Sequence, residues 1–218
     1  MSKINTVAVK ENIIEMLGDL KALVEIYTSD NKEVSTIEGN ESWTREHKDG
    51  QIGRVREKTK DAASKRFEEM QKHFEALAEV LRANDNVYDF SNPEFSSCIA
   101  LMSASAKQLP IETILGITEK FLGNRQALLA LAEIAKGPNE ETIRKHILNT
   151  ETEIENLQEK MISLEVGFPG NIIALPSFKD ALIRILKSCG EELTDQEKNL
   201  GTDYQDIVNM QIRAAFGL

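Results

Sequence analysis

The sequence predicts an all-α fold with a helical bundle-like core of seven to eight helices and one long amphipathic helix. Apolar residues recur at steps of three and four over long stretches, and no alternating strand of convincing length is present. Hydrophobic residues make up 41% of the 218 residues but aromatic residues only 6%. The core must therefore consist mainly of Leu, Ile, Val and Ala, which suits the packing of helix on helix.

The strongest periodic signal is a heptad pattern in which apolar side chains follow one another at alternating steps of four and three. It predicts one helix from Asn139 to Val166 that packs against another helix. The partner is either residues 63–81 of the same chain, whose rhythm matches, or a helix of another chain. The seam consists of Ile143, Ile147, Thr150, Ile154, Leu157, Met161 and Leu164.

The N-terminal part predicts a helix over residues 5–28 and a long helix over residues 51–83. In the long helix the apolar rhythm slips by one residue at Ala62 and Ala63, which moves the buried stripe around the helix. Residues 29–50 are polar and are expected to form a long connection. Trp43 in this stretch is either an anchor folded back onto the core, which is the preferred interpretation, or an exposed contact residue.

The remaining helices are expected to be shorter because proline and glycine mark their ends. We predict two domains: residues 1–84, a helical hairpin with a long polar loop and a long helix, and residues 85–218, a globular helical domain. A capping box formed by Thr194 and Glu197 opens a last helix that is expected to reach Ala215. The other expected helices span residues 93–107, 110–122, 125–136 and 177–189.

The charge of the chain is negative overall but uneven. The formal net charge of −10 argues against direct binding of nucleic acid. Residues 44–66 nevertheless hold eight Lys and Arg side chains against four Asp and Glu. This basic run is either a solvated helix face or a contact for an acidic surface. Its candidate contact residues are Arg45, Arg54, Arg56 and Lys58, together with Trp43.

No motif of a known reaction is present, so the sequence predicts neither an enzyme nor a cofactor. His47, His73 and His146 have no partner at metal-ligand spacing, and no metal site is expected. Cys98 and Cys189 are expected to be buried free thiols. No apolar run approaches the length of a membrane span, and the first residues do not resemble a signal peptide. A location in the cytoplasm or in a virion is expected.

Residues 42–77 read SWTREHKDGQIGRVREKTKDAASKRFEEMQKHFEAL. This stretch resembles small helical structural and accessory proteins of tailed bacteriophages of Gram-positive bacteria, in which an aromatic-Thr loop leads into an arginine-rich helix start and a long amphipathic helix. The resemblance covers about a sixth of the chain and has no catalytic or ligand motif to carry over. It implies a role as a scaffold, minor capsid or accessory component.

The sequence thus favours a non-enzymatic structural or assembly protein, a phage virion or morphogenesis component, that acts through helix-mediated contacts with itself or with other subunits. The alternative is an acidic regulatory binding module, an inhibitor or adaptor that docks on a basic surface of a partner protein. For the first hypothesis the expected contact residues are Trp43, Arg45, Arg54, Arg56, Lys58, Ile143, Ile147, Ile154, Leu157, Met161 and Leu164.

Overall fold

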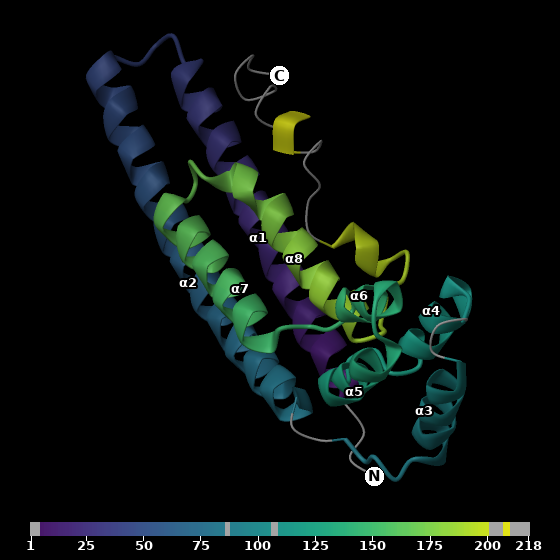
Figure 1. Ribbon diagram of the computed structural model, residues 1–218. Coiled ribbons are helices and arrows are strands. Elements are labelled where there is room, and N and C mark those ends of the chain that lie inside the picture. Colours follow the sequence, from purple (N-terminus) through teal and green to yellow (C-terminus); the bar gives the residue numbers. More distant parts are fainter. Residues whose placement is uncertain (1–4, 86–87, 106–108, 201–206, 210–218) are drawn as a thin grey trace. The chain divides into compact units, whose positions relative to one another are not determined.

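The structure is a computed structural model that describes residues 5–85, 88–105, 109–200 and 207–209. Within these residues it contains eight α-helices of seven residues or more and no strand (Figure 1). The predicted all-α, bundle-like fold is therefore confirmed. The α-helices are α1 (Thr6–Glu38), α2 (Arg45–Asp85), α3 (Pro93–Ser105), α4 (Ile111–Glu119), α5 (Arg125–Ala135), α6 (Pro138–Arg144), α7 (Thr150–Gly167) and α8 (Leu175–Ser188), and the 3-10 helices are η1 (Ile172–Ala174) and η2 (Glu197–Asn199).

The chain divides into two compact units, each made from three separate stretches. This division differs from the predicted boundary near residue 84, because four of the helices, α1, α2, α7 and α8, contribute residues to both units. Unit 1 consists of Met1–Glu11, Ala76–Glu155 and Ile183–Glu192, and unit 2 of Asn12–Glu75, Asn156–Leu182 and Leu193–Leu218.

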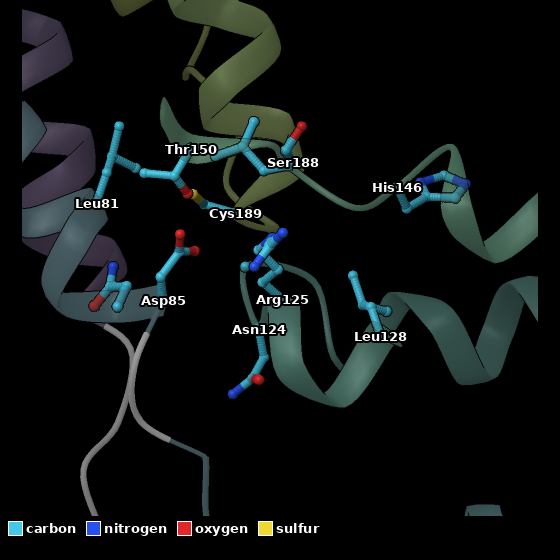
Figure 2. A pocket seen from close by; sticks show the side chains of 12 residues that line it. Leu81, Asp85, Asn124, Arg125, Leu128, His146, Thr150, Ser188 and Cys189 are labelled. Carbon is cyan, nitrogen blue, oxygen red and sulfur yellow. The ribbon is translucent and has the colours of Figure 1, made fainter. Parts of the chain in front are cut away.

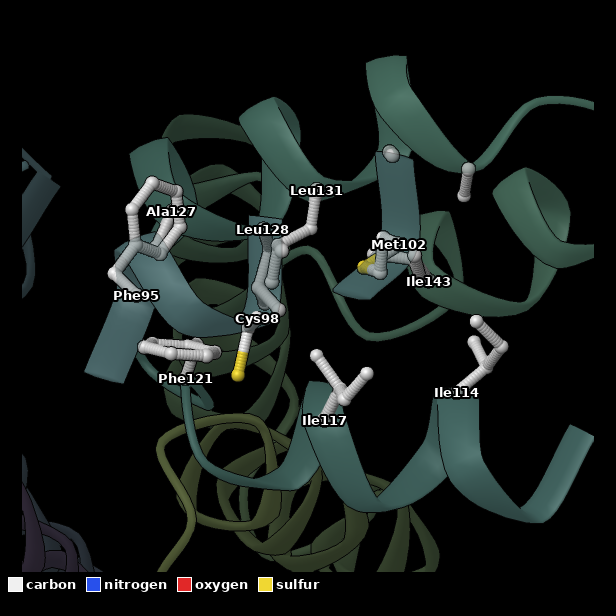
Figure 3. Close-up of a cluster of buried hydrophobic side chains, with 12 residues drawn as sticks. Phe95, Cys98, Met102, Ile114, Ile117, Phe121, Ala127, Leu128, Leu131 and Ile143 are labelled. Atoms are coloured by element: carbon white, nitrogen blue, oxygen red, sulfur yellow. The ribbon is translucent and has the colours of Figure 1, made fainter. Parts of the chain in front are cut away.

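The centre of unit 1 is a cluster of short helices, α3 to α6, whose ends follow the predicted stops closely. Asn124 caps α5, because its side-chain oxygen accepts a hydrogen bond of 3.0 Å from the backbone N–H of Ala127. Gly137, at φ 67°, turns the chain so that Pro138 can begin α6. Leucine, isoleucine and aromatic side chains of these helices form one buried cluster (Figure 3).

In unit 2, α1 does not end at residues 29–31 as predicted but continues to Glu38. The polar residues are accommodated because Asp30 is buried and accepts a hydrogen bond of 2.7 Å from the hydroxyl of Thr59 on α2. Further along, Ile37 is buried in a small cluster with two apolar residues of α2. The predicted long polar loop over residues 29–50 is therefore wrong, and six residues, 39–44, join the two helices.

Helix α2 has 41 residues, more than predicted at both ends. Its buried row passes through Val55, Thr59, Ala63 and Phe67 in three successive steps of four, whereas Ala62 is exposed. The apolar rhythm therefore changes where the sequence predicted a slip. Such extra steps of four shift the buried row around the helix, as a stutter does in a coiled coil.

The predicted continuous heptad helix is wrong, because the chain leaves the helix after Arg144 and α7 begins only at Thr150. Ile143 is part of the unit 1 cluster, and Ile147 packs against that cluster from the linking segment. A new helix start is encoded at the break, since Asn149 and Thr150 are followed by acidic residues in the first turn of α7. The apolar spacing continues across this position, so it does not indicate where the new helix begins.

Helix α7 lies alongside α2 (Figure 1). Near the start of α7, the carboxylate of Glu151 accepts hydrogen bonds of 2.9 and 3.0 Å from Arg82 of α2. Just beyond its end, the rings of Phe67 and Phe168 meet edge to face with centroids 6.0 Å apart. The seam of α7 is buried within the chain, so the structure realises the intrachain alternative, and residues 63–81 belong to the neighbouring helix α2.

Near the C-terminus, the prediction for α8 is confirmed, with a start two residues early. The capping box is present, since the Thr194 N–H donates to Glu197 at 2.6 Å and the Glu197 N–H donates to Thr194 Oγ1 at 3.3 Å. It opens only the short helix η2, after which Leu200 is extended, so the predicted start of a long helix here is wrong. Most of the predicted span to Ala215 lies outside the described residues.

Candidate functional site

Unit 2 contains a groove beside α1 and α2 with a volume of about 550 Å³. Ile26 contributes an apolar side chain from α1, and α2 contributes charged side chains and Ala62. We call this hollow the α1/α2 groove. It is lined by Ile26, Lys58, Asp61, Ala62, Lys65, Arg66 and Glu69.

A buried ionic network holds the two helices together beside this groove. Asp19 of α1 is 2% exposed, and its two carboxylate oxygens have different partners on α2. Arg66 donates to Oδ1 at 3.2 Å, and His73 Nδ1 lies 2.8 Å from Oδ2. Arg66 also pairs with Glu69 at 2.6 Å. The charge of Arg66 is thus used inside the chain and is not free for a partner.

Two lysines of the groove differ from Arg66 in this respect. Lys58 and Lys65 are exposed, and neither makes a hydrogen bond or ion pair with any residue that the structure describes. Together with Arg54 they stand at steps of four and seven along α2, which places all three on one side of the helix. We call these three residues the basic row.

The structure does not bring all the predicted basic residues together. Arg54 and Lys58 share the basic row, but Arg56 lies two residues from each and therefore points to a different side of α2. Arg45 is exposed and pairs with Asp49 at 3.1 Å within the first turns of α2. Lys65, which the sequence did not single out, is the nearer companion of Lys58 in the groove.

Trp43 lies in the six-residue connection between α1 and α2 and is 38% exposed. Its ring meets that of His47 edge to face, with centroids 4.7 Å apart. The preferred interpretation of Trp43 as an anchor on the core is therefore wrong. Its alternative role, as an exposed contact residue, remains a prediction.

The seam residues that were expected to bind a partner are core residues. Ile143, Ile154, Leu157, Met161 and Leu164 are at most 4% exposed, and Ile147 is partly buried against the unit 1 cluster. The opposite face of α7 is exposed. The sequence indicates an apolar character for this face, since Ile162 and Val166 stand at positions outside the seam.

Unit 1 contains a second, much smaller pocket of about 10 Å³, drawn in Figure 2. Three polar atoms of its lining residues are buried without a hydrogen-bond partner in the part of the chain that the structure describes: Asn84 Nδ2, Arg125 Nε and Thr150 Oγ1. The space is about that of one water molecule and is too small for a substrate. The side chains of Asp85 and Cys189 also line this pocket.

The electrostatic setting of Cys189 makes it an unreactive thiol. Burial raises its pKa to about 12, and the carboxylates of Asp85 and Glu191 add to the shift. The thiolate is the nucleophilic form, so this side chain stays protonated at neutral pH. Cys98 is buried as well, as the sequence predicted for both cysteines.

Among the residues that the structure describes, no group of three or more His, Cys, Asp and Glu side chains could hold a metal ion. In that same part of the chain, every helix is too short or too polar to cross a membrane. Comparisons with known proteins found no matching family model, no matching curated protein and no matching solved structure. The α1/α2 groove, which is lined by two residues of the basic row, Lys58 and Lys65, is the candidate surface for a partner.

Proposed function

We propose that this protein is a non-enzymatic structural or assembly protein that binds an acidic protein surface in the α1/α2 groove. The observation that carries the proposal is the exposure of Lys58 and Lys65 beside Ile26, with no intrachain partner for either ammonium group among the described residues. The groove also contains Asp61 and Glu69, but Glu69 is paired with Arg66, so Lys58 and Lys65 leave an excess of positive charge beside the apolar side chains of Ile26 and Ala62. This combination suits a helix or loop that carries aliphatic and acidic side chains.

The charge distribution supports a protein partner over a nucleic acid. The net charge of −10 disfavours a polyanion that extends over the surface beyond the basic row. At physiological salt, screening limits the attraction of the basic row to charges within about 8 Å. A partner with a local acidic patch gains from the row without meeting the repulsion of the whole chain.

The resemblance of residues 42–77 to phage structural and accessory proteins covers the part of α2 that carries Arg54, Lys58 and Lys65. It supports a role in a phage virion or in morphogenesis, with other subunits or further copies of this chain as partners. The buried seam of α7 is not part of this proposal, because its side chains stabilise the chain itself.

Site-specific photo-crosslinking tests the groove. A photoreactive residue replaces Ala62 in the full chain, which is irradiated in an extract of cells that carry the native gene. Lys60, which is exposed but points away from Lys58, is the matched control position. We expect one discrete crosslinked protein from position 62, abolished by Lys58→Glu with Lys65→Glu, and none from position 60. Absence of a discrete product at position 62 would overturn the proposal.

The second candidate function is a regulatory binding module that uses an acidic face on a basic partner. It is favoured by Glu159 and Glu165, which are exposed on α7 and have no ion pair in the described part of the chain. This function predicts that the crosslinks arise from α7 and that Glu159→Lys abolishes them. Crosslinks that depend on Lys58 and Lys65 would exclude it.

A further inference from the structure

The outward face of α7 carries a row that is unusual for a surface. Ile162 is 50% exposed and Val166 is 83% exposed, and with Glu159 they stand at steps of three and four on the side opposite the buried seam. We call Glu159, Ile162 and Val166 the α7 stripe. Ile173 of η1 is a third exposed aliphatic residue in this stretch, at 42%.

The chain beyond α7 is held back against that helix. The side-chain amide of Asn171 donates hydrogen bonds to the backbone oxygen and the hydroxyl of Ser163, at 3.1 and 3.0 Å. These hydrogen bonds hold the segment that leads to η1 against α7 within unit 2. Exposed aliphatic side chains grouped on fixed elements are typical of a contact surface.

We propose that the α7 stripe of one copy docks in the α1/α2 groove of a second copy. This inference rests on the proposed function and names the partner. The two surfaces are complementary: Ile162 and Val166 would cover Ile26 and Ala62, and Glu159 would meet Lys58 or Lys65 at the edge of the groove.

The charges of the chain favour this stripe over its other acidic segment as the occupant. In residues 191–197 two of the carboxylates already have partners: Glu191 accepts from Thr6 at 2.9 Å, and Asp195 pairs with Lys198 at 2.8 Å. Glu159 has no such partner among the described residues, and no aliphatic residue in that other segment reaches the exposure of Val166. Of these two segments, the stripe is the one that combines exposed aliphatic side chains with a carboxylate that has no partner among the described residues.

The stripe and the groove are different surfaces, so the contact is heterologous. Every copy carries both, and two copies can either exchange stripes in a closed pair or add further copies head to tail. In both cases association must rise with protein concentration. It must weaken with added salt, because part of the contact is an exposed charge pair.

Sedimentation velocity on the full chain tests the contact with two variants made only at exposed positions. The groove variant is Lys58→Glu with Lys65→Glu, and the stripe variant is Ile162→Ser with Val166→Ser. We expect the unchanged chain to associate, and each variant alone to associate at least tenfold more weakly. An equimolar mixture of the two variants should recover a dimer, because the intact stripe of one meets the intact groove of the other.

Lys60→Glu is the control for a change of charge on α2 outside the groove, and circular dichroism checks that every variant is folded. A chain that is monomeric at all concentrations and salt levels would overturn the inference, as would a stripe variant that associates normally or a mixture that recovers no dimer. If these results occur while position 62 still crosslinks to a different protein, the proposed function stands and only the second copy is excluded as the partner.

Discussion

Two buried polar side chains of this protein, Asp19 and Thr150, differ in whether they have hydrogen-bond partners among the described residues. In unit 2, both oxygens of the Asp19 carboxylate have partners, Arg66 and His73. In the small pocket of unit 1, Thr150 is as well buried as Asp19, at 2% exposure, yet its hydroxyl has no partner. A buried polar group stabilises a fold only when it is paired, and an unpaired one costs its full desolvation. Burial alone therefore does not predict the sign of a mutational effect.

The largest effect is expected at Asp19. Asp19→Ala removes the acceptor that Arg66 and His73 share, at a cost of about 3 kcal/mol in the free energy of unfolding, because each hydrogen bond to a carboxylate contributes about 1.5 to 3 kcal/mol. Urea denaturation measures this change. Asp61→Ala, in the exposed groove, is the matched control and should stay within about 0.5 kcal/mol. A loss below about 1 kcal/mol for Asp19→Ala would show that the network contributes little.

A smaller loss is expected at Thr59, which extends the comparison to an uncharged donor. Thr59→Val keeps the shape of the side chain but removes the hydrogen bond of 2.7 Å to the buried carboxylate of Asp30. The unfolding free energy should fall by about 2 kcal/mol, because the bond is made to a charged group. Thr28→Val supplies a reference, since its hydroxyl is exposed and bonds the carbonyl of its own helix. Equal losses for the two variants would contradict the assignment.

The buried thiol of Cys189, in the pocket of unit 1, predicts a loss of stability at alkaline pH. The pKa of Cys189 is about 12 in the folded chain, whereas an unfolded thiol titrates near 8.5. Between these values the unfolded chain binds fewer protons, so stability must fall as pH rises from about 9 towards 12. The slope is at most about 1.4 kcal/mol per pH unit. Urea titrations at pH 8, 9 and 10 should show this slope, and Cys189→Ala should reduce it; an unchanged slope would refute the prediction.

The smallest change in the free energy of unfolding is expected at Thr150, and this change tests the comparison most directly. Thr150→Val is the same substitution as Thr59→Val, but here it removes a hydroxyl that has no partner. Stability should stay the same or rise by up to about 1 kcal/mol. A fall of about 1 kcal/mol, measured in the same urea series, would show that a water molecule in the pocket pairs the hydroxyl in solution. The contrast between the two sites would then disappear.

Much of the fold could be predicted because local signals agreed with the packing. Pro110 precedes α4, Asn124 caps α5 and Gly137 separates α5 from α6, each through local backbone geometry or a local hydrogen bond. The predicted end of the first helix at residues 29–31 is wrong because the hydrogen-bond partner of Asp30, Thr59, is 29 residues away in the sequence. The predicted single heptad helix is wrong because the apolar spacing continues across Asn149 and Thr150, where the chain starts a new helix.

The candidate site could be predicted less well than the fold. The basic run was visible in the sequence, but composition does not say which of its charges are used internally, as Arg66 is, and which are free, as Lys58 is. The helical period does separate Arg54 and Lys58 from Arg56 once the helix is known to be continuous. The seam spacing places Val166 on the face of α7 opposite the buried one, but the spacing does not say whether another element covers that face.

The place of Trp43 has a practical consequence for the optical study of this protein. It is the only tryptophan of the chain, and it lies in the connection between the two longest helices of the described residues. Its fluorescence is therefore a local reporter of the helical hairpin's end and of the adjacent imidazole of His47. Unfolding followed by tryptophan emission will register the opening of this turn, whereas circular dichroism will register the loss of the helices themselves.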